Sequence, residues 1–144
     1  MRQDTAVSVW VRLLKAHALL LRALRRRVPD GLTLPQFDVL VQLARHEEGM
    51  THGQLTRALL VTGGNVTGLV DRLARSGLVE RRPHPRDRRA VRLALTPRGR
   101  AVVQRALPRH TREIEALLQG LPARDLARLR DLLGRLNRSL EDAA

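Results

Sequence analysis

The amino-acid sequence predicts a mainly helical protein with one small β-hairpin. Apolar residues near both ends of the chain recur at alternating steps of three and four, which is the spacing of a helix face. Trp10 and Phe37 are the only aromatic residues, so the core is expected to consist of Leu, Val and Ala, which suits packed helices. In residues 91–95, larger apolar residues alternate with Arg92 and Ala94, which is the period of a strand.

The first predicted helix covers residues 5–28. Its apolar or large residues form one stripe: Val7, Trp10, Leu14, His17, Leu21, Leu24 and Val28. Because a single helix with so much apolar surface needs a partner, we expect this stripe to pack against another helix. Pro29, Asp30 and Gly31 end the helix.

Three further helices are predicted in the middle of the chain. Thr33 with Gln36, and Thr51 with Gln54, have the spacing of a capping box, so each pair should begin a helix. After a tight turn, Thr62 is expected to cap a third helix of about 14 residues, which Gly77 ends. Two short helices followed by a turn and a longer helix form the helix-turn-helix layout.

The β-hairpin follows this layout and carries a high positive charge. Residues 78–82 and 90–95 should be its strands, joined by a loop that two prolines stiffen. Residues 78–100 contain eight Arg against Glu80 and Asp87, a net charge of +6 in 23 residues. A basic hairpin directly after a helix-turn-helix is the wing of a winged helix-turn-helix, although a merely solvated basic hairpin is the simpler alternative.

The C-terminal third should again be helical. Thr96 caps a helix with Pro97 at its first position, and this helix continues to about Gln119 with a bend expected at Pro108. A last helix repeats the alternating steps of three and four with Leu126, Leu129, Leu133, Leu136 and Leu140. The predicted organisation is therefore an N-terminal dimerisation helix (1–32), a winged helix-turn-helix (33–96) and C-terminal dimerisation helices (97–144).

The predicted recognition helix combines small and polar residues at its start. Without a Cβ, the glycines let the helix end press into a groove and direct its amide groups at phosphate. Asn65 can bind adenine or phosphate, and Thr67 can contact a thymine methyl group. Thr51 and Gln54, at the start of the preceding helix, are also predicted to contact DNA. The contact residues predicted around the recognition helix itself are Thr62, Gly63, Gly64, Asn65, Thr67, Gly68, Arg72 and Arg75. Alternatively, the glycines only lengthen the turn before a shorter helix.

The tip of the wing supplies a second set of predicted DNA contacts. Arginine at such a tip can enter the minor groove, where the negative potential is strongest. The residues are Arg86, Asp87, Arg88 and Arg89. Asp87 does not suit phosphate, so we expect its carboxylate to fix the direction of the Arg89 guanidinium.

Three stretches in this order resemble the MarR family (multiple antibiotic resistance regulators): VTGGNVTGLVDRLARSGLV at 61–79, DRRAV at 87–91 and LTPRG at 95–99. The resemblance extends over residues 33–99. It implies an obligate dimer with interlocked terminal helices, a recognition helix that starts at Thr62 in the major groove, and Asp87 and Arg89 at the minor groove. It also implies repression or activation of nearby genes, often relieved by a small phenolic or similar ligand.

The terminal helices provide the residues for pairing and for such a ligand. The predicted dimerisation residues are Val7, Trp10, Leu14, Leu126, Leu129, Leu133, Leu136 and Leu140. Trp10 and His17 lie on one stripe and, with Phe37, are candidates for the wall of a ligand pocket. For Trp10 and His17 the alternative is contact with the partner helix, and for Phe37 it is a place in the core.

Several functions are not expected. The absence of Cys excludes disulfides, thiolate metal sites and thiol-based sensing. His46, Glu47 and His110 do not have the spacing of a metal site, and no cofactor is expected. No nucleophile–base arrangement or phosphate loop suggests an enzyme, and Asp71 beside Arg72 is interpreted as a surface pair. Without an 18-residue apolar run or a signal-peptide core, we expect a cytoplasmic protein and no membrane partner.

The net charge of +13 attracts polyanions, although a preference for Arg can also follow from genome composition. The predicted function is therefore a sequence-specific, double-stranded-DNA-binding transcription regulator. We expect a ligand-responsive repressor that binds a pseudo-palindromic operator as a homodimer. The alternative is a non-specific basic protein that shapes DNA.

Overall fold

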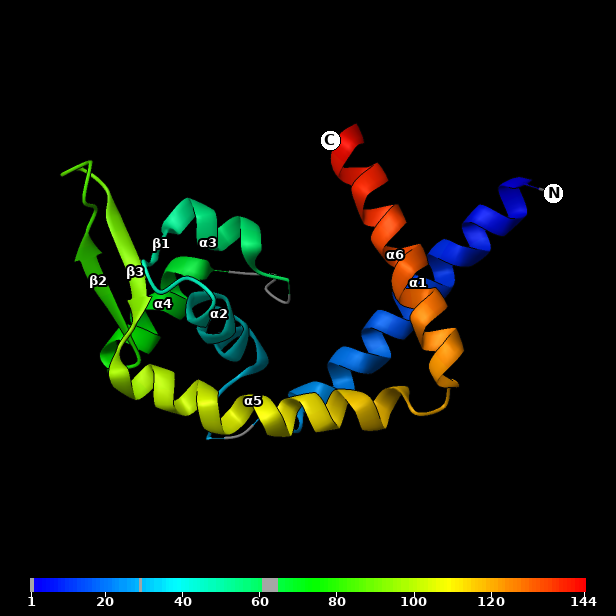
Figure 1. Ribbon diagram of the computed structural model, residues 1–144, viewed down its shortest axis with the longest axis horizontal. Coiled ribbons are helices and arrows are strands. Elements are labelled where there is room, and N and C mark those ends of the chain that lie inside the picture. Colours follow the sequence, from blue (N-terminus) through cyan, green and yellow to red (C-terminus); the bar gives the residue numbers. More distant parts are fainter. Residues whose placement is uncertain (1, 29, 61–64) are drawn as a thin grey trace. The chain divides into compact units, whose positions relative to one another are not determined.

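A computed structural model describes residues 2–28, 30–60 and 65–144, without the side chains of Arg2 and Gln3. It divides into two compact units, Met1–Thr111 and Arg112–Ala144, with the boundary inside one helix. The elements, drawn in Figure 1, are α1 (Arg2–Arg25), α2 (Leu34–Ala44), β1 (Met50–Thr51), α3 (His52–Ala58), α4 (Val66–Arg75), β2 (Val79–Pro83), β3 (Val91–Leu95), α5 (Pro97–Leu118) and α6 (Ala123–Ala143). The prediction of a mainly helical winged helix-turn-helix is confirmed. The three-part division by role, 1–32, 33–96 and 97–144, remains a prediction.

The sheet has three antiparallel strands in the order β1-β3-β2. In the β2–β3 hairpin Val79 pairs with Leu95 and Pro83 pairs with Val91, so the predicted wing is present. Sequence analysis missed β1, whose two residues pair with Arg92 and Leu93. A strand of two residues is too short to show an alternating pattern.

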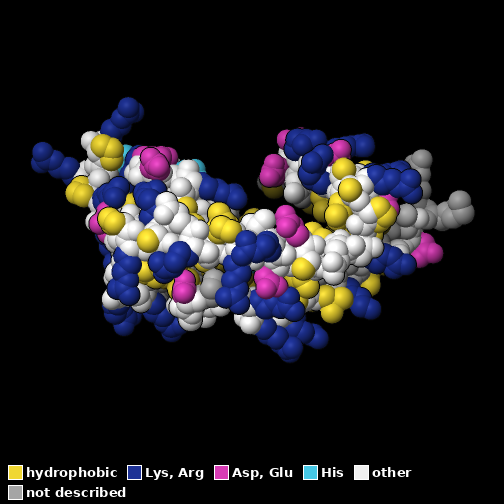
Figure 2. All heavy atoms as spheres, turned by 60° about the horizontal axis from the view of Figure 1, so that its bottom comes forward, with side chains coloured by type: hydrophobic (Ala, Val, Ile, Leu, Met, Phe, Trp, Pro, Cys, Tyr) yellow, Lys and Arg dark blue, Asp and Glu magenta, His cyan; other side chains and the backbone are white. Residues whose placement is uncertain are grey.

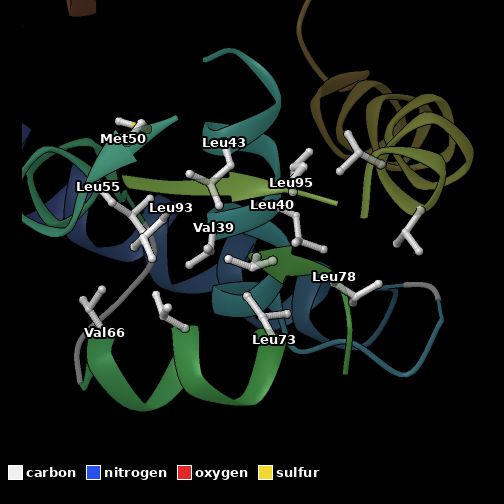
Figure 3. Close-up of a cluster of buried hydrophobic side chains, with 14 residues drawn as sticks. Val39, Leu40, Leu43, Met50, Leu55, Val66, Leu73, Leu78, Leu93 and Leu95 are labelled. Atoms are coloured by element: carbon white, nitrogen blue, oxygen red, sulfur yellow. The ribbon is translucent and has the colours of Figure 1, made fainter. Parts of the chain in front are cut away.

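The core of the first unit lies where α2, α3 and α4 pack against the sheet (Figure 3). Val39, Leu40 and Leu43 from α2 meet Leu93 and Leu95 from β3. Three further helices contribute buried side chains to this cluster: Leu55 from α3, Val66, Val70 and Leu73 from α4, and Val102 and Val103 from α5. Each buried Leu or Val contributes about 2 kcal/mol to folding by leaving water, so this cluster fixes α4 on the scaffold.

Both predicted capping boxes are formed. Thr33 Oγ1 accepts from the Gln36 amide at 3.3 Å while Gln36 Oε1 accepts from the Thr33 amide at 3.0 Å. Thr51 and Gln54 make the same pair of bonds at 3.2 and 2.9 Å. Each box therefore pairs two backbone N–H groups at the start of its helix.

The start of the recognition helix differs from the prediction. The helix α4 begins at Val66, and Asn65 is its N-cap, with Asn65 Oδ1 accepting from the Gly68 amide at 3.0 Å. Thr62 was expected in this role, but it lies with Gly63 and Gly64 outside the described residues. Asn is at least as good an N-cap as Thr, and glycine is costly inside a helix, so the ten-residue helix that starts after the glycines is favoured.

Thr96 and Gly77 lie where the end of α4, the base of the wing and the start of α5 meet. Gly77 has a φ of 73° and ends α4, as predicted. Thr96 also caps α5 as predicted, because its hydroxyl accepts from the Gly99 amide at 3.0 Å. The same hydroxyl donates to the Gly77 carbonyl at 2.6 Å, and the Thr96 amide donates to the Leu78 carbonyl at 3.1 Å. These bonds join the end of α4, the base of the wing and the start of α5.

The outer helices carry large exposed apolar side chains. On α1, Val7 and Trp10 are each 60% exposed, and Leu14 is also exposed. Within the second unit, α6 contains no buried residue, and Leu129, Leu136 and Leu140 are exposed. Six of the eight residues that were predicted to form the dimer interface are therefore exposed in the single chain, whereas Leu126 and Leu133 are half-buried. None of the described helices combines the length and apolarity that crossing a membrane requires.

Candidate nucleic-acid interface

The recognition helix α4 has one buried and one exposed face. Val66, Val70 and Leu73 face the core. Among the residues predicted to touch DNA, Asn65, Thr67, Arg72 and Arg75 are exposed and Gly68 is half-buried. The helix therefore presents polar and cationic groups to solvent along the face that the sequence analysis assigned to DNA.

A histidine that sequence analysis missed adjoins this face. His52 is the first residue of α3, and its Nε2 lies 3.2 Å from the Thr67 hydroxyl oxygen. Both side chains are exposed, so the pair is accessible to a bound duplex. Neutral imidazole can accept from the hydroxyl or donate to it, and this choice decides which hydrogen-bonding role Thr67 has left for a base. No local pattern connects two residues that are 15 positions apart.

The α3 helix contributes the predicted Thr51 and Gln54 in a restricted way. Each side-chain oxygen accepts one backbone bond in the capping box, which fixes the orientation of both side chains. The amide nitrogen of Gln54 is a separate donor on an exposed residue. Gln54 can therefore donate to a phosphate while the cap stays intact.

The turn before the recognition helix is anchored from α2. The buried Asp38 accepts from the Leu60 amide at 2.8 Å through Oδ2, and its Oδ1 lies 3.4 Å from Gln42 Nε2. A buried carboxylate requires such partners, because burial without them is costly. Asp38 thereby fixes the end of the segment that follows α3, which was not anticipated from the sequence.

An ion pair joins the recognition helix to the wing. Asp71 on α4 accepts from the Arg81 guanidinium on β2. The sequence interpretation paired Asp71 with Arg72; the recorded ion pair is with Arg81, whose strand returns along α4. Both side chains are close to half exposed, so the pair contributes little to stability but restricts how the wing and helix are oriented.

The wing tip is held by two side chains that bond to the backbone. His84 Nδ1 accepts from the amides of Arg86 and Asp87 at 3.1 and 3.2 Å. Asp87 Oδ1 accepts from the Arg89 amide at 2.9 Å. The expectation that Asp87 orients the Arg89 guanidinium is therefore corrected: the recorded bond is to the Arg89 amide, because a short Asp side chain reaches its own turn first.

Arginines cover the hairpin. Arg86, Asp87, Arg88 and Arg89 are all exposed. In Figure 2, dark blue arginine side chains project on the left, the side on which Figure 1 draws the wing. Further back, Arg92 donates to the Glu48 carbonyl at 3.1 Å, and its Nη2 lies 3.5 Å from His84 Nε2. The tip is thus a cluster of solvated guanidinium groups on an ordered turn, which suits a narrow, negative groove.

The candidates for a ligand pocket are not brought into one cavity. Phe37 is buried and its ring contacts that of His110, with centroids 4.9 Å apart. Trp10 is exposed. His17 lines an open surface pocket of about 500 Å³ on one side of α1, and its further lining residues come from α1 and the residue after it: Ala18, Leu21, Arg22, Arg25 and Arg26. Of the three, His17 is therefore the one that adjoins a cationic cavity.

The candidate metal ligands are also apart. His110 contacts Phe37, whereas His46 Nδ1 lies 3.4 Å from the Glu48 carboxylate. The pKa of the Glu48 carboxyl is lowered from its ordinary value. The largest cause is a backbone hydrogen bond at Glu48, and the second is the hydrogen bond with the His46 side chain. Among the residues the structure describes, no three His, Asp or Glu side chains are grouped to hold a metal ion.

Comparison with known proteins identifies similar chains. The family model described as "MarR family" matches residues 30–90. The multiple antibiotic resistance protein MarR of Salmonella typhimurium is 34% identical over 109 residues, which cover 75% of each chain. A solved MarR family regulator from Silicibacter pomeroyi is 32% identical with a TM-score of 0.82, over 96% of this chain and 97% of the other. PcaV of Streptomyces coelicolor, solved with its natural ligand, is 29% identical with a TM-score of 0.70, over 92% and 91%.

Proposed function

This chain belongs to the MarR family of DNA-binding transcriptional regulators, and we propose that it is a homodimeric, ligand-responsive repressor of a pseudo-palindromic operator. Like the similar proteins, it is a transcription regulator and not an enzyme.

The proposal for DNA reading rests on the exposed polar face of α4, which lies beside the arginine-rich wing and is joined to it by the Asp71–Arg81 ion pair. In winged helices the recognition helix enters the major groove through its N-terminal residues, here Asn65 and Thr67. The wing then extends toward the adjacent minor groove, where Arg86, Arg88 and Arg89 meet the most negative potential. Gln54 and Arg72 are proposed to position the protein through phosphates.

Exposed apolar side chains support pairing of two copies. Trp10 and Leu14 on α1, and Leu129, Leu136 and Leu140 on α6, would lose contact with water in a dimer. Large exposed apolar patches are uncommon on monomers and usually mark interaction surfaces. A two-fold pair would present two recognition helices about one turn of DNA apart, which explains a pseudo-palindromic operator.

The cavity at His17 is the proposed place of the effector. Three guanidinium groups, from Arg22, Arg25 and Arg26, line this open pocket beside apolar Ala18 and Leu21. This lining fits a phenolic acid, whose carboxylate pairs with arginine while its ring contacts the apolar side chains. PcaV is described in complex with a natural ligand, which supports a ligand site in this chain as well.

Competition binding at fixed salt tests sequence-specific recognition. The affinity for pseudo-palindromes from the chain's own promoter region is compared with that for random duplexes. A specific regulator should prefer its operator by about 10³-fold or more, whereas a ratio below about 10 would favour a non-specific architectural protein.

Transcription in vitro from the same promoter tests the sign of regulation. A repressor bound across the promoter should reduce transcript, and adding the effector should restore it. Increased transcript on adding the protein alone would contradict repression while leaving DNA binding intact.

A further inference from the structure

A histidine closes the loop between β2 and β3, at the tip of the wing drawn in Figure 1. His84 Nδ1 accepts from the amides of Arg86 and Asp87 at 3.1 and 3.2 Å. The His84 amide donates to the Ala90 carbonyl at 3.2 Å, and the Ala90 amide donates to the Asp87 carbonyl at 3.2 Å. These four bonds close residues 84–90, here called the wing-tip turn. The arginines of this turn are exposed, and their side chains take part in none of the four bonds.

Nδ1 of His84 has the position that the side-chain oxygen of Asn or Asp has in an Asx turn. Both atoms are bonded to Cγ, so they are separated from the backbone by the same number of bonds. In an Asx turn the oxygen accepts from the amide two residues further on, and Asn or Asp before Pro commonly starts such a turn. Here Pro85 follows His84, and the amide two residues on is that of Arg86. The wing-tip turn therefore has an ordinary geometry, but its acceptor can bind a proton.

Only a neutral imidazole can close the turn in this way. The neutral ring carries one proton, and because Nδ1 of His84 accepts, that proton is on Nε2. A second proton would occupy Nδ1, so both ring nitrogens would be donors and the amides of Arg86 and Asp87 would lose their acceptor. The protonated ring and the closed turn therefore exclude each other. As pH falls through the range in which imidazole gains a proton, the open turn should be favoured.

Arg92 on β3 lies on the other side of the ring. Its Nη2 is 3.5 Å from His84 Nε2, and its Nη1 donates to the Glu48 carbonyl at 3.1 Å. The loop before β1 lies directly on β3, because a Cβ on Gly49 would be 2.9 Å from the Leu93 carbonyl oxygen. Arg92 is thereby held beside the ring. A protonated His84 would face donors on both sides, the two amides at Nδ1 and the guanidinium at Nε2, so the ring would have to turn away.

The charged groups around His84 come from three segments. Arg92 is on β3, the Glu48 carboxylate is in the loop before β1, and the wing-tip turn itself carries Arg86, Asp87, Arg88 and Arg89. Arginine and carboxylate side chains ordinarily stay ionised between about pH 5 and 8, where imidazole gains a proton. His46 Nδ1 lies 3.4 Å from the Glu48 carboxylate, so His46 is a second imidazole of this cluster. A change at the wing tip in this range therefore points to an imidazole.

We propose that His84 is a positioning residue for DNA reading and that its protonation opens the wing-tip turn. With the neutral ring, the closed turn presents Arg86, Arg88 and Arg89 to the minor groove as a preformed set. With the protonated ring, these arginines must be ordered by the DNA itself, so the preference for the operator falls as pH falls. The added charge attracts every duplex alike, so affinity for random DNA does not fall with it. This regulation rests on the proposed function, because it concerns how the same chain reads its operator.

The pH dependence of operator preference tests this role. Preference is the affinity for the pseudo-palindrome from the promoter region divided by that for a random duplex of equal length, at fixed salt. His84→Asn supplies an acceptor that does not titrate. Its preference should equal that of the parent chain at about pH 7.5 and exceed it about tenfold at about pH 5.5, where the parent loses two hydrogen bonds. His84→Ala lacks the acceptor, so its preference should be about tenfold below that of the parent at the higher pH.

His46→Asn is the matched control, because it removes the second imidazole of the cluster and leaves the wing-tip turn unchanged. Its pH dependence should equal that of the parent chain. His52, beside the recognition helix, is present in every variant, so its titration cancels from the comparison. Thermal unfolding at both pH values establishes that each variant is folded. The same pH dependence in the parent and His84→Asn, or loss of the parent's pH dependence in His46→Asn, would overturn the proposal.

NMR of the chain without DNA tests the turn itself. The ¹⁵N signals of the His84 ring should show Nδ1 without a proton at about pH 7.5, and the amide proton signals of Arg86 and Asp87 should move upfield as the ring gains its second proton. In His84→Asn these amide signals should stay in place. A neutral ring with its proton on Nδ1, or amide signals that do not follow the ring, would overturn the proposal. Absence of operator preference at the higher pH would instead refute the proposed function, and the NMR titration would still decide the role of His84 in the turn.

Discussion

The α carbon of Gly99 lies directly against the carbonyl group of Leu78. A Cβ on residue 99 would be 2.1 Å from the Leu78 oxygen, and that oxygen also accepts from the Thr96 amide. Neither side of the contact can yield by rotating a side chain. The approach of α5 to the base of the wing therefore depends on the absence of one methyl group.

Gly99→Ala should lower the free energy of unfolding by about 2 kcal/mol or more, because the α5 start and the wing must separate. Chemical denaturation measures this loss. Gly120→Ala is the control, since nothing lies within 4 Å of a Cβ built at residue 120. Equal stability of the two variants would show that the Leu78 contact is not constraining.

Thr67 and His52 should act on DNA as one unit. Thr67→Val keeps the shape of the side chain but removes the hydroxyl that lies near His52 Nε2. Operator affinities of Thr67→Val, His52→Ala and the double variant form a cycle. We expect a coupling energy of about 0.5–1 kcal/mol, as found for residues in contact. Strict additivity would mean that the two side chains meet DNA independently.

Arg89→Ala should weaken operator binding by about 1–3 kcal/mol and leave the oligomeric state unchanged. Fluorescence anisotropy at several salt concentrations measures the affinity and its salt slope. Arg124→Ala, on the exposed start of α6, is the control and should leave both unchanged. Unaltered binding by Arg89→Ala would remove this tip arginine from the interface.

Asp87 should act through its oxygen and not its charge. Asp87→Asn keeps an acceptor for the Arg89 amide, so this variant should bind operator at least as well as the parent chain. Asp87→Ala loses the bond and should weaken binding by about 1 kcal/mol, because the tip loses its turn. Equal weakening in both variants would restore the guanidinium-orienting role that the sequence suggested.

Leu129→Asp combined with Leu136→Asp should yield monomers with little affinity for operator, because two charges would enter the proposed apolar interface. Light scattering measures the mass. Ala127→Asp places one charge on the exposed side of the same helix opposite those leucines and should stay dimeric. A dimer of the double variant would show that α6 does not form the interface through these residues.

Local features were predictable from the sequence, and contacts between distant segments were not. The boxes at Thr33 and Thr51 depend on residues three positions apart, so their pattern alone determines them. The start of α4 was less certain, since Thr62 and Asn65 are both good caps and only the cost of the intervening glycines separates the two. The shorter helix that was left as an alternative is the one that forms.

The missed site features all connect different elements. His52 reaches Thr67 across the turn between α3 and α4, Asp71 reaches Arg81 on β2, and Asp38 reaches the Leu60 amide. No spacing rule links such pairs, because the packing of whole helices decides them. Asp87 shows the opposite error: a bond to its own turn was available, but a more distant partner was expected.

The order of the wing tip does not depend on the groups that reach outward. His84 and Asp87 close the turn through backbone amides, and none of the bonds recorded for the described residues of the tip uses the side chain of Arg86, Arg88 or Arg89. The side chains at those three positions therefore do not stabilise the turn. Exchanging them alters what the hairpin reads without remaking the hairpin, so a lineage can drift toward new target sequences at this point while its scaffold stays unchanged.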